Sequence, residues 1–112
     1  ENSTPTTTSI SKTGFTLETD IDEVGTIYYV VLANNATAPT AAEVKSGTGN
    51  GGASVITSEN AAVSTGDFTY NFNVTGLTEG IAYDVYVVAE DNRRTPNLQA
   101  SPTKIDVTTF TL

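Results

Sequence analysis

The strongest constraint on the fold is a two-residue alternation in the second half of the chain. Phe68, Tyr70, Phe72 and Val74 alternate there with Thr69, Asn71, Asn73 and Thr75. Successive side chains of a β-strand point to opposite faces of the sheet. The alternation therefore predicts a strand with one buried face and one solvated face.

Other segments show the same alternation or are apolar on both faces. Residues 26–32 (Thr-Ile-Tyr-Tyr-Val-Val-Leu) are apolar throughout, which is typical of a central strand covered on both sides. In residues 15–20, Phe15, Leu17 and Thr19 share one face. About seven short strands with turns between them predict an all-β fold, a two-sheet antiparallel sandwich. The expected strands are residues 1–9 (first edge strand or linker), 15–20, 26–32, 55–57, 68–75, 83–90 and 103–109, the last with Ile105 and Val107 inward.

The segment 33–66 departs from this strand pattern over most of its length. It is rich in Ala, Asn, Gly, Ser and Thr. Thr40, with Pro39 before it and Glu43 three residues later, has the spacing of a capping box and predicts a short helix over residues 40–46. Gly47 ends this helix, and a flexible glycine-rich loop follows as far as Ala53.

Length and composition favour a single domain without catalytic chemistry. The 112 residues suit one domain, which we place at residues 10–112. A net charge of -8 disfavours nucleic acid and anionic membranes as partners. The chain has no His and no Cys, which removes imidazole bases, thiolates and the usual zinc sites. We expect no enzyme activity, no catalytic residue and no cofactor.

No apolar run approaches the length of a membrane span, so we expect no membrane insertion. Glu1 opens the chain without a charged leader or an apolar signal core. We therefore expect a mature protein or an excised domain.

Residues 74–89 resemble the corner of a fibronectin type III module, which reads Leu-x-Pro-Gly-x-x-Tyr-x-Val-x-Val. The matching residues are Leu77, Gly80, Tyr83, Val85 and Val87. The resemblance implies that the Leu fills the core at the turn and that the Tyr hydroxyl returns to a backbone group upstream.

The chain departs from the module at two points. Glu79 replaces the usual Pro, and the second strand has no Trp, so Phe15, Leu17, Tyr29, Tyr70 and Phe72 are expected to fill the core. The chain also resembles bacterial immunoglobulin-like surface modules. Both resemblances imply a location outside the cell or on its surface.

One candidate surface is the pole where, by this resemblance, the turn at residues 20–25 and the loop at residues 91–99 meet. Carboxylates of the kind that suit calcium gather there, and a pair of arginines could recognise an anionic group. The simpler interpretation is a solvated pole with loose ion pairs, because no regular calcium-loop spacing is present. The residues are Asp20, Asp22, Glu23 and Asp91 for calcium, and Arg93 and Arg94 for an anionic partner.

A second candidate surface is the set of apolar side chains that faces away from the expected core. It consists of Tyr28, Val30, Leu32, Tyr86 and Val88. The segment 33–66 could fold back over this set, a neighbouring domain could cover it, or Tyr28 and Tyr86 could form a platform that stacks on sugar rings.

The sequence therefore favours a spacer and interaction module of a secreted, bacterial multidomain protein or extracellular enzyme. Its expected partners are neighbouring domains, with a protein or glycan ligand as a further possibility for adhesion. The alternative is a small carbohydrate-binding module that uses the aromatic platform.

Overall fold

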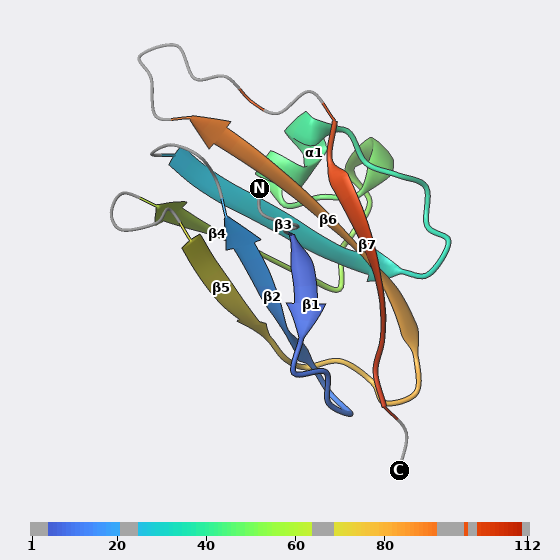
Figure 1. The fold of residues 1–112 in the computed structure, drawn as a ribbon. Helices are drawn as coiled ribbons and strands as arrows, with labels where there is room; N and C mark the ends of the chain where they lie inside the picture. Colours follow the sequence, from blue (N-terminus) through green and yellow to red (C-terminus); the bar gives the residue numbers. More distant parts are fainter. Residues whose placement is uncertain (1–4, 21–24, 64–68, 92–97, 99–100, 111–112) are drawn as a thin grey trace.

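The chain folds into two antiparallel sheets that pack face to face, as predicted (Figure 1). The structure is a computed structural model and describes residues 5–20, 25–63, 69–91, 98 and 101–110. The three-stranded sheet has the order β1-β2-β5, and the four-stranded sheet has the order β4-β3-β6-β7. The strands are β1 (Thr6–Thr8), β2 (Phe15–Asp20), β3 (Gly25–Ala33), β4 (Thr57–Val63), β5 (Thr69–Val74), β6 (Ala82–Asp91) and β7 (Thr103–Thr108).

The main core lies between the two sheets and contains the side chains that the alternation assigned to it. Phe15, Leu17, Tyr29 and Phe72 are all buried there. Thr19 is also buried on this face, and its hydroxyl donates to the backbone oxygen of Tyr70. The other buried members are Ile27, Val31, Val63, Val74, Leu77, Tyr83, Val85, Val87 and Val107, with Ile105 partly buried against them.

The prediction that Tyr70 fills the core is wrong. Its side chain keeps 41% of its exposure, although its ring lies 4.7 Å from that of Phe72. Tyr70 is the second residue of β5 and pairs with Thr19, the last residue but one of β2. At this end of the sheet the core-facing side is open to solvent. A side chain that points toward the core there remains partly exposed.

Strand β4 is longer than the sequence suggested. The expected short strand at residues 55–57 is instead a strand from Thr57 to Val63, paired along its length with β3 from Gly25 to Val31. Glu59, Asn60 and the adjacent alanines have weak strand propensity, which is why the pattern missed them. Their pairing with the central strand β3 overrides that local preference.

The insertion between β3 and β4 covers the outer face of the four-stranded sheet (Figure 1). It contains the helix α1 (Ala41–Ser46) and the single 3-10 turn η1 (Asn50–Gly52). Ala41 and Val44 of α1 pack on the apolar side chains that the sequence placed on this face. Three interpretations were open for this apolar set, and in the structure the insertion of the same chain covers it. This second core contains Val30, Leu32, Ala41, Val44, Tyr86 and Val88, with Tyr28, Ala36, Val55 and Leu98 partly buried against it.

The turn before β6 has the contact that the family resemblance implied. The backbone N–H of Thr78 donates to the hydroxyl oxygen of Tyr83 at 2.8 Å, and Leu77 is buried in the core. Gly80 has a φ of 67°, a left-handed conformation that glycine adopts without a steric penalty.

Tyr83→Phe is expected to lower the free energy of unfolding by about 1–2 kcal/mol, because the Thr78 N–H loses its acceptor while the ring stays in place. Urea unfolding of the two proteins measures this difference. Thr108→Val, at an exposed β7 position, provides a control and is expected to change stability by less than about 0.5 kcal/mol. Equal stability of Tyr83→Phe and the parent chain would show that the hydroxyl does not stabilise the turn.

Candidate functional site

Glu43 organises the insertion through both of its carboxylate oxygens. Oε1 accepts the backbone N–H of Thr40 at 2.8 Å, and the Thr40 hydroxyl accepts the backbone N–H of Glu43 at 3.2 Å. This is the capping box that the sequence predicted, and Gly47 ends the helix in the left-handed conformation, also as predicted. Oε2 accepts the backbone N–H of Gly51 at 2.6 Å. One side chain therefore ties the start of α1 to η1.

The attachment of η1 to Glu43 should weaken in acid. The backbone N–H of Thr40, and also that of Gly51, hold the pKa of the Glu43 carboxyl below its usual value. A carboxyl whose pKa is lowered by folding stabilises the fold above its unfolded pKa of about 4.3. That contribution is lost as the pH falls through the lower folded pKa.

We therefore expect hydrogen exchange at the Gly51 amide to be protected equally at pH 7 and pH 5, relative to the intrinsic rate, and to lose protection below about pH 4. NMR-detected exchange measures this, and Glu43→Gln is expected to show low protection at all three pH values. An unchanged protection factor below the unfolded pKa would contradict the role of the Glu43 carboxylate.

The helix is also tied to the sheet by a polar cluster at one edge of the second core. The Lys45 ammonium lies 2.7 Å from Oε2 of Glu90, and this hydrogen bond raises the pKa of Lys45. The Tyr28 hydroxyl donates to Oε1 of Glu90 at 3.4 Å. Tyr28 is half-buried beside this cluster.

The alternative in which Tyr28 and Tyr86 form a platform for sugar rings does not fit the structure. The Tyr86 side chain is only 5% exposed, because α1 lies over it. Val30, Leu32 and Val88 of the same set are buried too. This part of the sheet therefore contributes to stability, and a ligand cannot reach it while the helix is docked.

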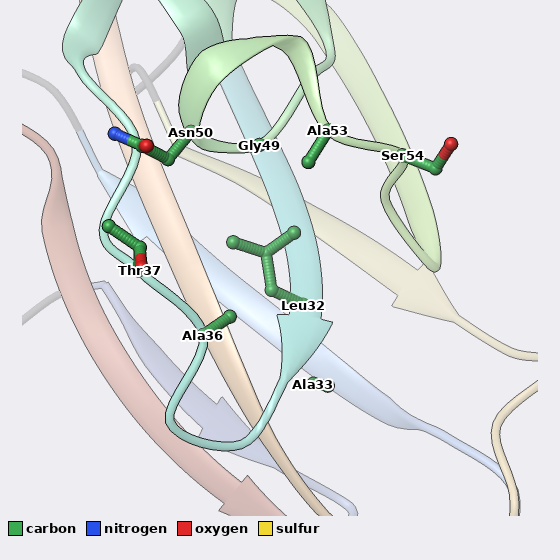
Figure 2. Close-up of a pocket in the computed structure, with 8 residues that line it drawn as sticks. All are labelled: Leu32, Ala33, Ala36, Thr37, Gly49, Asn50, Ala53 and Ser54. Atoms are coloured by element: carbon green, nitrogen blue, oxygen red, sulfur yellow. The ribbon is translucent and has the colours of Figure 1, made fainter.

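A cavity of about 250 Å³ lies beside the end of β3. Its walls are the first residues of the insertion on one side and the residues around η1 on the other. Figure 2 shows the side chain of Leu32 pointing between the segment 36–37 and the turn η1. Leu32 and Gly49 are buried at its base, whereas Thr37, Asn50 and Ser54 are exposed at its rim. We call this space the insertion cavity; its lining residues are Leu32, Ala33, Ala36, Thr37, Gly49, Asn50, Ala53 and Ser54.

Asp84 is a buried carboxylate that sequence analysis did not single out. Its side chain is fully buried on the outer face of β6. Oδ2 accepts the backbone N–H of Asn35 at 3.0 Å and lies 3.8 Å from the Lys104 ammonium. Oδ1 has no hydrogen-bond partner. The signal in the sequence was an acidic residue inside the otherwise apolar run Tyr-Asp-Val-Tyr-Val-Val, and Asp84 anchors the first turn of the insertion, where Asn35 has a φ of 66°.

The predicted calcium and arginine sites lie largely outside the described residues. The described residues do not include Asp22, Glu23, Arg93 or Arg94. For Asp20 the structure describes only the backbone. Gly25 at the start of β3 pairs with Asp91 at the end of β6, so the strand ends that flank the two loops adjoin. Within the described ranges, no group of three or more His, Cys, Asp or Glu side chains could hold a metal ion.

Neither a known protein family, nor a curated protein, nor a solved structure matches this chain. In the part of the chain that the structure describes, no helix has the length and apolar character needed to cross a membrane.

Proposed function

We propose that this chain is a non-catalytic spacer and interaction module of a secreted or cell-surface protein, with a fibronectin type III-like or immunoglobulin-like character. The observation that carries the proposal is that one chain buries both faces of the β3–β6 strand pair. The three-stranded sheet covers the inner face, and the insertion covers the outer face. Such a module is stable without a neighbour, as a spacer has to be.

The path of the chain through the domain supports a role in a linear array. The domain measures 47 × 32 × 20 Å along its principal axes. Thr6 pairs with Glu18 near the end of β2, and β1 then runs toward the opposite end of the sandwich. Phe110 follows β7 at that opposite end, where its backbone N–H donates to the Ser11 oxygen at 3.0 Å (Figure 1). In Figure 1, β1 begins near the middle of the sandwich and β7 ends at one end of it.

The turn before β6 supports the finer, family-level part of the proposal. A Tyr near the start of the sixth strand, with its hydroxyl bonded a few residues upstream, is a feature of immunoglobulin-like sandwiches. Tyr83 and Thr78 have this contact. Such modules occur in many extracellular multidomain proteins, which supports neighbouring domains of the parent chain as the first partners.

A tandem of two copies joined by a short Gly-Ser linker tests the spacer role. Small-angle X-ray scattering is expected to give a maximum dimension of about twice that of the single chain, whose long axis is 47 Å. The single chain, expected to be a monomer, is the control. A compact tandem with side-by-side copies, or a single chain that needs a partner to fold, would overturn the proposal.

A further inference from the structure

Strand β5 forms a free edge of the three-stranded sheet. In the described part of the chain it pairs with β2 alone, and Figure 1 shows it as the outermost strand of that sheet. The backbone N–H and C=O groups on the free side of an edge strand can pair with another extended chain. Such an edge can therefore bind a further strand unless its own sequence prevents this.

The other three edge strands are protected against strand addition. Strand β1 has only three residues, and β7 has the exposed charges of Lys104 and Asp106. Glu59 of β4 is in register with Tyr29, whose side chain lies in the main core, so Glu59 points inward at the edge. Short edges and charges of these kinds oppose a further strand, because the added strand would bury the charges.

Strand β5 has none of these protections. Its six residues, Thr69–Val74, include no charged residue, no Pro and no Gly. Thr, Tyr, Phe and Val all favour an extended backbone. The inward side chains of Phe72 and Val74 are buried, whereas the outward side chains of Asn71 and Asn73 are exposed. Among the described strands, β5 is therefore the edge that is most open to a partner strand.

The core is incomplete beside this edge. Tyr70 is in register with the buried Thr19 and faces the core, yet its side chain keeps 41% of its exposure. A strand added next to β5 would lie about 4.8 Å from it, and its inward side chains would contact the ring of Tyr70. An apolar side chain at that position would remove aromatic surface from water, which favours binding.

The charges of the three-stranded sheet favour a basic partner. Its strands contain Glu18 and Asp20 but no Lys or Arg. Glu18 is in register with Asn71, so an outward side chain placed opposite Asn71 would start about 10 Å from Glu18. A Lys or Arg side chain spans much of that distance. A second copy of the chain would instead bring a further net charge of -8, which disfavours it as the occupant.

We propose that the free edge of β5 binds an extended, basic peptide segment of a partner protein as a fourth strand of this sheet. Apolar residues of the segment face inward beside Tyr70, and its Lys or Arg residues face outward on the side of Glu18. Main-chain hydrogen bonds supply the affinity, and the alternation of apolar and basic residues supplies the specificity. The inference adds a binding surface to the module and does not depend on its role as a spacer.

The test is an amide NMR titration of the whole chain with the synthetic peptide Lys-Val-Lys-Val-Lys-Val, capped at both ends. We expect saturable shifts and slower hydrogen exchange at Asn71, Phe72 and Asn73. The dissociation constant should be on the order of 0.1–1 mM, because ordering a flexible peptide offsets most of the gain. The peptide Glu-Val-Glu-Val-Glu-Val should bind roughly fivefold more weakly or worse. No shifts with the Lys peptide, shifts centred on another strand, or equal affinity for the Glu peptide would overturn the proposal.

Tyr70→Glu and Asn73→Glu place the same charge on the two faces of β5. Tyr70→Glu creates an inward charge of the kind that protects β4, and it should weaken binding of the Lys peptide by roughly tenfold or more. Asn73→Glu adds the charge on the exposed outer face and should keep or raise the affinity. Unchanged or higher affinity in Tyr70→Glu would show that net charge alone holds the peptide. Lower affinity in Asn73→Glu would rule out the proposed orientation of the peptide.

N-methylated peptides test the main-chain pairing without altering the protein. Methyl groups on every Val nitrogen block one edge of the peptide, and methyl groups on every Lys nitrogen block the other. At least one of the two peptides should bind roughly tenfold more weakly or worse. Undiminished affinity of both would exclude strand pairing.

Self-association has its own signature in the same experiment. Shifts at β5 that grow with protein concentration in the absence of peptide would identify a second copy as the occupant and overturn the proposal. Scattering from the tandem tests the spacer role separately, so the two proposals can fail independently.

Discussion

Val44→Asp is expected to release α1 from the sheet and to lower the free energy of unfolding by about 3 kcal/mol. Val44 is 1% exposed and packs on the apolar outer face of β3 and β6. An unpaired carboxylate cannot stay in this position, and the helix of six residues is too short to persist without its packing. Undocking exposes Val30, Leu32 and Val88, and an apolar patch of this kind promotes self-association.

The matched control is Ala42→Asp, which adds the same charge to the exposed face of the same helix. Urea unfolding, binding of a hydrophobic dye and sedimentation velocity compare the two variants. The control should remain monomeric and close to the parent chain in stability. A monomeric Val44→Asp chain without dye binding would show that the insertion is dispensable as a cover.

Tyr29→Ala is expected to lower the free energy of unfolding by about 3–5 kcal/mol, comparable to the whole stability of a small domain. The Tyr29 side chain is 1% exposed and meets Phe72 edge-on, with ring centroids 4.8 Å apart. Burial, and then the negative charge of Glu59, raise the pKa of its hydroxyl. The loss of this ring leaves a cavity at the centre of the sandwich.

Tyr70→Ala is the matched control, because Tyr70 also contacts Phe72 but keeps 41% of its exposure. It should cost less than half as much as Tyr29→Ala. Thermal unfolding followed by circular dichroism is sufficient to rank the two variants. Similar losses of stability in both would contradict the assignment of Tyr29 to the centre of the core and Tyr70 to its rim.

Local patterns in the sequence determined two features: the strands in which apolar and polar residues alternate, and the two ends of the helix. The alternation at residues 15–20 and 69–74 is a direct consequence of the pleat, so it identified the strands and most of their buried residues. Thr40, Glu43 and Gly47 predicted α1 because a capping box and a left-handed cap involve only neighbouring residues. The apolar set on the outer face was likewise visible, since it follows from the two-residue period.

Tertiary structure alone decided what covers each surface and where polar groups are buried. Whether α1 or a ligand lies over Tyr86 depends on the path of the insertion, which no local pattern encodes. Strand β4 forms because β3 offers it a partner, against the weak strand propensity of Glu59 and Asn60. Tyr70 is exposed because its register places it at an open end of the sheet, and Asp84 is buried because the insertion brings the Asn35 N–H to it. Each of these outcomes depends on contacts between residues far apart in the chain, whereas the periodicity of a strand reports only on its own two faces.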